Sequence, residues 1–81
     1  MKRVQVKGKD VRQGGLTKYL NRKIGVMATF YMTYRDNKEW NAKIFRGNIV
    51  SASNGLVVLS DPATGMQYIL RYRNLDYITF D

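Results

Sequence analysis

Residues 37–50, NKEWNAKIFRGNIV, contain the only tryptophan of the chain and an apolar run that one glycine interrupts. The alternation of this stretch places Trp40, Ala42 and Ile44 on one face and Phe45, Gly47 and Ile49 on the other. A period of two is typical of a β-strand. Because glycine has no side chain to obstruct a bend, we expect the strand to curl at Gly47, with apolar residues on both sides of it pointing inward in turn.

The rest of the chain repeats this strand pattern between turn signals. Strands are expected over residues 26–34, 40–49, 56–59, 67–72 and 77–80. Asn54-Gly55 predicts a tight hairpin, because both residues tolerate positive φ. The segment DPATG, residues 61–65, predicts a longer hairpin loop.

One short helix is expected before the first of these strands. Leu16, Tyr19, Leu20 and Ile24 fall at spacings that share a helix face. Thr17 is available as a cap and Gly25 as a stop. The predicted fold class is therefore mainly β, a small five-stranded antiparallel SH3-like or Sm-like barrel with one short N-terminal helix over residues 16–81.

The charge of the chain lies mostly near its start. The formal net charge is +8, yet residues 1–23 carry eight basic residues against Asp10, whereas residues 24–81 carry six basic and five acidic residues. Residues 1–15 show no apolar period and contain several glycines, so we interpret them as a flexible basic arm.

Several classes of function are excluded by composition. The chain has no cysteine and no histidine, which removes the usual zinc sites and every His-based base or nucleophile arrangement. No stretch approaches the roughly 18 apolar residues that cross a bilayer, and no apolar signal-peptide segment follows the basic start. We expect a soluble protein without cofactor, metal, catalytic residues or membrane insertion.

The aromatic and acidic residues leave alternatives open. Glu39 beside Trp40 could start a reactive site, but the other acids of the body sit at turns or strand ends, so catalysis is disfavoured. Trp40 either caps one end of the barrel or anchors a partner. Six further aromatic residues fill the core or form a stacking platform for bases: Phe30, Tyr31, Tyr34, Tyr68, Tyr72 and Tyr77.

The segment from Arg71 to Asn74 suggests a second class of function. Arg71, Tyr72 and Arg73 precede the last strand, where Sm-like proteins keep a basic and polar loop. In a homo-oligomeric ring these residues would bind single-stranded RNA in a salt-dependent way. The same three residues are otherwise candidates for contact with a protein partner.

Three phrases of the sequence indicate a known family. ATFYMTYRDNKEWNAKIFRGNI, VVLSDPATGMQYIL and NLDYITFD occur in that order. From about Leu16 to Asp81 the chain resembles the C-terminal domain of the spore coat protein GerQ family. The resemblance implies a non-enzymatic component of the endospore coat that helps to localise a CwlJ-like cell-wall hydrolase, which degrades cortex during germination.

The resemblance also implies cross-linking by a spore transglutaminase to other coat proteins. That enzyme needs a glutamine carboxamide and an amine on loose backbone, and the arm supplies Gln5 and Gln13 together with lysines. Lys2, Lys7 and Lys9 are the candidate cross-linking residues. The alternative reading of the arm is a solvated charged tail.

Overall fold

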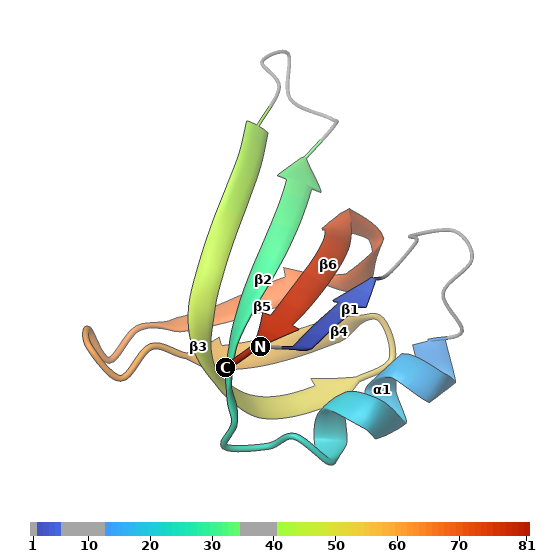
Figure 1. The fold of residues 1–81 in the computed structure, drawn as a ribbon, viewed down its shortest axis with the longest axis horizontal. Helices are drawn as coiled ribbons and strands as arrows, with labels where there is room; N and C mark the ends of the chain where they lie inside the picture. Colours follow the sequence, from blue (N-terminus) through green and yellow to red (C-terminus); the bar gives the residue numbers. More distant parts are fainter. Residues whose placement is uncertain (1, 6–12, 35–40) are drawn as a thin grey trace.

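The computed structural model describes residues 2–5, 13–34 and 41–81, with side chains for residues 14–34 and 42–81. Its elements, in chain order, are β1 (Lys2–Gln5), α1 (Gln13–Asn21), β2 (Met27–Tyr34), β3 (Asn41–Ser53), β4 (Leu56–Ser60), β5 (Gln67–Arg71), the 3-10 turn η1 (Tyr72–Asn74) and β6 (Leu75–Phe80) (Figure 1). The predicted mainly β class and the single short helix are confirmed.

The strands form one antiparallel sheet in the order β1-β6-β2-β3-β4-β5. The five expected strands are all present as β2 to β6. Closure into an SH3-like or Sm-like barrel is not confirmed, because β1 and β5 stand at opposite ends of this order and no pairing joins them in the described part of the chain. The sheet is open, so it keeps two edges.

One strand was not expected from the sequence. β1 lies within residues 1–15, where we predicted a flexible arm, and it pairs with β6, so that Lys2 faces Phe80 and Gln5 faces Tyr77. Its four residues, KRVQ, carry one apolar side chain and hence no period of two. Without β1 the edge of β6 would expose unpaired backbone groups, and this pairing satisfies them.

β3 carries the bend that the sequence predicts. In Figure 1 it curves strongly, so that its first half runs beside β2 and its second half turns beneath the core toward β4. A Cβ atom on Gly47 would lie 2.7 Å from the carbonyl oxygen of Ser60 and 3.0 Å from its carbonyl carbon. The bend therefore brings two backbone segments closer than any other residue type would permit.

The inward positions of β3 differ in part from the expectation. Phe45 is half-buried and Gly47 and Ile49 are buried, but Ile44 is 65% exposed. The strand keeps its period of two through the bend, so only one of its faces is covered. A register irregularity between Ile49 and Ser51 then shifts the alternation by one residue, and Ala52 becomes buried.

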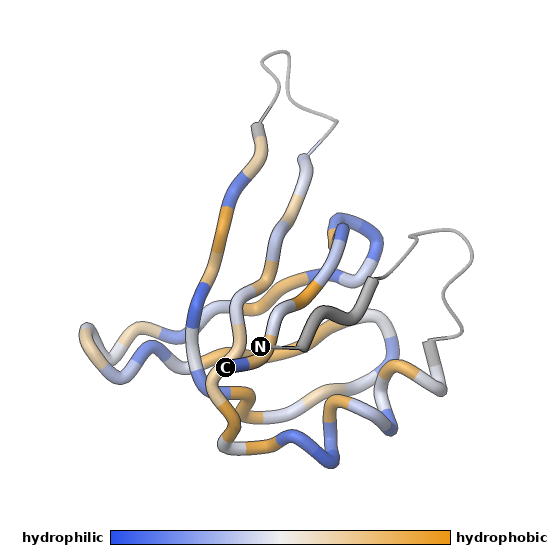
Figure 2. Tube along the Cα trace, in the orientation of Figure 1, coloured by the Kyte–Doolittle hydropathy of each residue, from blue (hydrophilic) through white to orange (hydrophobic). Residues whose placement is uncertain are grey.

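The core lies between the curved sheet and the helix. Figure 2 shows apolar and polar residues alternating along the strands that enclose it. Its buried apolar residues are Leu16, Leu20, Ala28, Phe30, Met32, Ile49, Ala52, Val57, Leu59, Leu70, Tyr72, Leu75, Ile78 and Phe80. Helix and sheet thus contribute to one continuous hydrophobic cluster.

α1 is held against the end of β3 by polar contacts as well as by its apolar face. Asn21 Nδ2 donates to the carbonyl oxygen of Ala52 at 3.0 Å, and the Ala52 N–H donates to Asn21 Oδ1 at 3.2 Å. The amide of Asn21 thereby completes the hydrogen bonds of β3 as a neighbouring strand would. Thr17 is not the predicted cap, because the helix begins at Gln13 and Thr17 Oγ1 donates to the Ser53 carbonyl oxygen at 3.2 Å.

The turn that follows α1 agrees with the expected stop. Gly25 has a φ of 87°, the left-handed conformation that glycine adopts without strain. Its N–H donates to the Ile49 carbonyl oxygen at 2.8 Å, and the Ile49 N–H donates to the Val26 carbonyl oxygen at 3.1 Å. The turn is therefore fastened to the middle of β3.

Replacing Gly47 with alanine should destabilise the fold by about 1 to 3 kcal/mol, because the added methyl group meets rigid backbone. Gly15→Ala is the matched control, since a Cβ there meets nothing within 4 Å and the position is helical. That control should stabilise by about 0.5 to 1 kcal/mol. Urea titration followed by circular dichroism measures both changes, and equal behaviour of the two variants would contradict the close approach at Gly47.

Asn21→Ala should destabilise the protein by about 1 to 3 kcal/mol, because it removes the partners of both backbone groups of Ala52. Arg22→Ala, at the exposed neighbouring position, should change the free energy of unfolding by less than about 0.5 kcal/mol. Hydrogen exchange adds a local readout, since the Ala52 amide should lose protection in Asn21→Ala alone. Unchanged protection at Ala52 would refute the role of the two hydrogen bonds between Asn21 and Ala52.

Candidate contact surface

The three contact residues predicted before the last strand are described, and their environments differ. Arg71 ends β5, and Tyr72 and Arg73 belong to η1. Arg71 and Arg73 are exposed, whereas Tyr72 is only 2% exposed and lies in the core. The segment therefore presents two guanidinium groups on either side of a buried anchor.

Tyr72 is fixed by contacts to separate parts of the chain. Its N–H donates to the Gly55 carbonyl oxygen at 3.0 Å, and its hydroxyl lies 2.9 Å from Thr17 Oγ1. Burial raises the pKa of the Tyr72 hydroxyl, and the hydrogen bond to Thr17 acts in the opposite direction. Tyr72 thus connects η1 to helix α1 and to the turn after β3. These contacts hold the backbone of Arg71 and Arg73 in place.

An apolar row crosses the outer face of β3, β4 and β5. Ile69 is 69% exposed and pairs in register with the half-buried Val58. Val58 in turn faces Ser51, next to Val50, which is 39% exposed at the irregularity of β3. We call Val50, Val58 and Ile69 the outer stripe. It ends at β5, beside Arg71 on the same face of that strand.

Sequence reasoning did not name Ile69 or Val50 as surface residues. The signal was present for Ile69, because the alternation over residues 67–72 places it on one face with the polar Gln67 and Arg71. The same signal exists for Val50, because the alternation that turns Gly47 and Ile49 inward turns Val50 outward. The irregularity between Ile49 and Ser51 instead decides that Ala52 is buried in place of Ser51, and the sequence does not reveal where such a shift falls.

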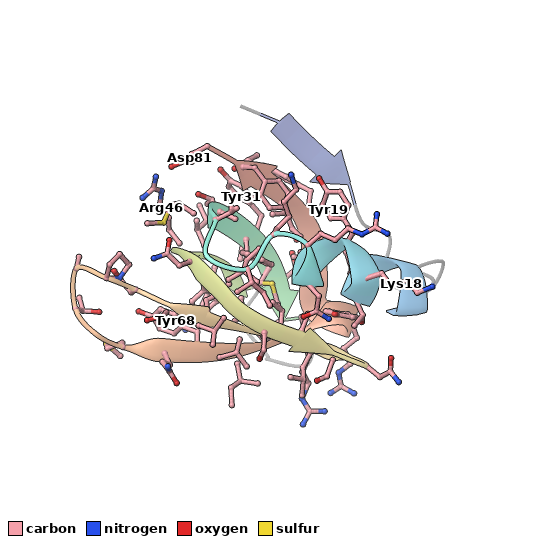
Figure 3. All side chains as sticks on the ribbon, turned by 90° about the horizontal axis from the view of Figure 1, so that it is seen from below. Lys18, Tyr19, Tyr31, Arg46, Tyr68 and Asp81 are labelled. Atoms are coloured by element: carbon pink, nitrogen blue, oxygen red, sulfur yellow. The ribbon has the colours of Figure 1, made fainter. Side chains whose placement is uncertain are left out.

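The electrostatics of the described surface favour acidic partners. Its basic side chains are Lys18, Arg22, Lys23, Lys43, Arg46, Arg71 and Arg73, and its acidic ones are Asp61, Asp76 and Asp81. Arg46 forms an ion pair with Asp81, and the two side chains lie close together in Figure 3. Lys23 lies over the rings of Tyr19 and Phe80, with Nζ 5.6 and 5.8 Å from their centroids.

The described acids all make local structural contacts. Asp61 Oδ1 accepts the Ala63 N–H at 2.9 Å within the loop after β4. Asp76 accepts the hydroxyl of Thr33 from the adjacent strand. Across the described ranges, no group of three acidic, histidine or cysteine residues gathers as a metal site would require. Within those ranges, too, no helix has the length and apolar character needed to span a bilayer.

The aromatic residues fall into two groups. Phe30 and Tyr72 are buried, and Tyr34 and Tyr68 pack against the core. On the opposite face of β2, Tyr31 stacks on Tyr77 with ring centroids 4.2 Å apart and planes inclined by 19°. The core interpretation therefore describes most of the set.

Several predicted residues lie outside the described part of the chain or are known there by backbone alone. Glu39, Trp40, Lys7 and Lys9 belong to the residues that the structure does not describe. Lys2 and Gln5 are the first and last residues of β1, and Gln13 begins α1. Lys2 thus sits on paired backbone, whereas cross-linking by a transglutaminase needs loose chain.

Comparison with known proteins identifies the family. The sequence profile of the family described as Spore coat protein (Spore_GerQ) matches residues 17–81. Over 62 residues the chain is 52% identical to the spore coat protein GerQ of Bacillus subtilis (strain 168). The matched stretch covers 76% of this chain and 33% of that protein. The chain thus matches about a third of the length of this relative. Residues 17–81 span the sheet from β2 to β6 together with most of α1, and the chain belongs to the spore coat protein GerQ family.

Proposed function

We propose that this chain is a non-enzymatic structural and docking component of the endospore coat. Its family is that of a spore coat protein, and the domain that matches is the described sheet and helix. The acids of the described residues serve loop, strand and ion-pair contacts, and this supports recognition as the role of the described surface. The location in the coat follows from the name of the relative.

The observation that carries the docking role is the pair of exposed arginines on either side of Tyr72. Because the Tyr72 ring is buried and its hydroxyl and N–H are both bonded, Arg71 and Arg73 project from a rigid segment. A guanidinium group on fixed backbone loses less conformational freedom on pairing with a carboxylate than one on a mobile loop. The neighbouring outer stripe adds an apolar contact area.

The proposed partner is a CwlJ-like cell-wall hydrolase, which the coat component would hold near the cortex until germination. An acidic patch beside apolar side chains on that partner would complement the arginines and the outer stripe. A spore transglutaminase would then fix the chain to other coat proteins through Lys2, Lys7 or Lys9. Docking and cross-linking are separate proposals, because they use opposite ends of the chain.

Single-stranded RNA binding by a homo-oligomer remains the alternative. The basic excess of the described surface supports it. The burial of Tyr72 weighs against it, because a ring in the core cannot stack on a base. The docking proposal uses the arginines without requiring that ring at the surface.

The double variant Arg71→Glu/Arg73→Glu should weaken binding to the purified hydrolase by roughly tenfold or more, which corresponds to about 1.4 kcal/mol. Lys43→Glu is the control, since Lys43 is also exposed but lies on β3, which β2 separates from β6 in the sheet. Isothermal titration calorimetry at physiological salt measures both. Absence of binding by the unaltered chain, or equal weakening by the control, would overturn the proposed docking site. A parallel titration with single-stranded RNA distinguishes the alternative.

Incubation with a spore transglutaminase and a glutamine-donor peptide should place adducts on Lys2, Lys7 or Lys9, which peptide mass spectrometry locates. Replacing all three lysines with arginine keeps the charge but removes the reactive amines, so labelling should fall to the level of the enzyme-free control. If the adducts instead appear on Lys18 or Lys43, or if none form, the cross-linking proposal is wrong while docking is unaffected.

A further inference from the structure

β5 is an open edge of the sheet. It stands last in the strand order, and within the described residues it pairs with β4 alone. An edge strand presents unpaired N–H and C=O groups that can bond to another strand. β5 reads QYILR, and its outward side chains are exposed.

The hydrogen bonds at the two ends of the β4–β5 ladder show which backbone groups face outward. Next to the Leu56–Arg71 pair, at one end of the ladder, the Tyr72 N–H donates to the Gly55 carbonyl oxygen at 3.0 Å. Next to the Ser60–Gln67 pair, at the other end, the Asp61 N–H donates to the Met66 carbonyl oxygen at 2.8 Å. Both pairs belong to the hydrogen-bonded set, which recurs at every second residue of an antiparallel ladder.

The residues of β5 therefore divide into two sets. Tyr68 and Leu70 belong to the same set as these end pairs and direct their backbone groups toward β4. Gln67, Ile69 and Arg71 belong to the other set, and their N–H and C=O groups point to the open edge. Their side chains also project from the exposed outer face, where Ile69 ends the outer stripe.

The strand is complementary to itself when a second copy runs antiparallel with Ile69 at the centre. Gln67 then faces Arg71 of the second copy, Tyr68 faces Leu70, and Ile69 faces its own equivalent. Arg71, the only charged residue of β5, falls opposite an uncharged amide whose oxygen can accept from its guanidinium group. In the register shifted so that Arg71 faces itself, two like charges would oppose each other, which is destabilising.

This register also brings together the outward backbone groups and the outer stripes of the two copies. The outward backbone groups of Gln67, Ile69 and Arg71 meet their counterparts in hydrogen-bonded pairs, and the two outer stripes become one apolar row across the two-fold axis. A symmetric pairing of this kind closes on itself and leaves no further β5 edge. We propose that two copies of this chain pair through β5 in the antiparallel register centred on Ile69, which joins their sheets into one.

Sedimentation equilibrium of the full chain over a range of concentrations tests the pairing. The unaltered chain should reach twice the monomer mass at high concentration, and Ile69→Lys should raise the dimer dissociation constant by about tenfold or more, because two ammonium groups would meet at the axis. Ile44→Lys is the control, since Ile44 is 65% exposed and lies on β3, away from this edge. Its dissociation constant should stay unchanged. Circular dichroism checks that both variants remain folded.

A second measurement does not depend on the lysine variant. The chain contains no cysteine, so a single Ile69→Cys substitution gives one reactive thiol per copy. A short bismaleimide should link Ile69→Cys into dimers, because the two positions face each other, and should leave Ile44→Cys monomeric. A monomer at every concentration, a dimer that Ile69→Lys does not weaken, or equal linking at both positions would overturn the proposed pairing.

Discussion

The close approach of the β3 backbone at Gly47 to the chain at the end of β4 is the constraint on which the structure depends. With 2.7 Å between an ideal Cβ position and the Ser60 carbonyl oxygen, side chains other than hydrogen are excluded there. This contact allows one long strand to leave β2 and turn beneath the core toward β4. A chain of this size can then cover one face of its sheet with little more than a single helix.

The bend also decides what remains on the surface. Because β3 keeps its alternation through Gly47, one face is buried and the other carries Ile44 outward. The same alternation carries Val50 outward, where it belongs to the outer stripe that runs to the edge at β5. β1 covers the opposite edge, at β6. The described sheet thus ends in the short strand β1 on one side and in β5 on the other.

Much of this fold could be predicted from local patterns. The five strands, the glycine at the bend and the left-handed Gly25 all follow from alternation and glycine chemistry. β1 could not be predicted, because its stability comes from a distant edge and not from its own residues. For Tyr72 the sequence left the core and a stacking platform open, since the partners that fix it, Thr17 and Gly55, are remote in sequence. Arg71 and Arg73 could be predicted as contact residues from their charge, because the charge of a side chain does not depend on distant partners.

The measurement that tests the bend most directly is a nuclear Overhauser spectrum of the chain in solution. A Cβ at Gly47 would lie 3.4 Å from the Asp61 nitrogen, so an α-proton of Gly47 should lie close to the Asp61 amide proton. A cross-peak between these protons, with slow amide exchange across β4, is the predicted result. Absence of the cross-peak together with rapid exchange in β4 would contradict a sheet held together by this approach.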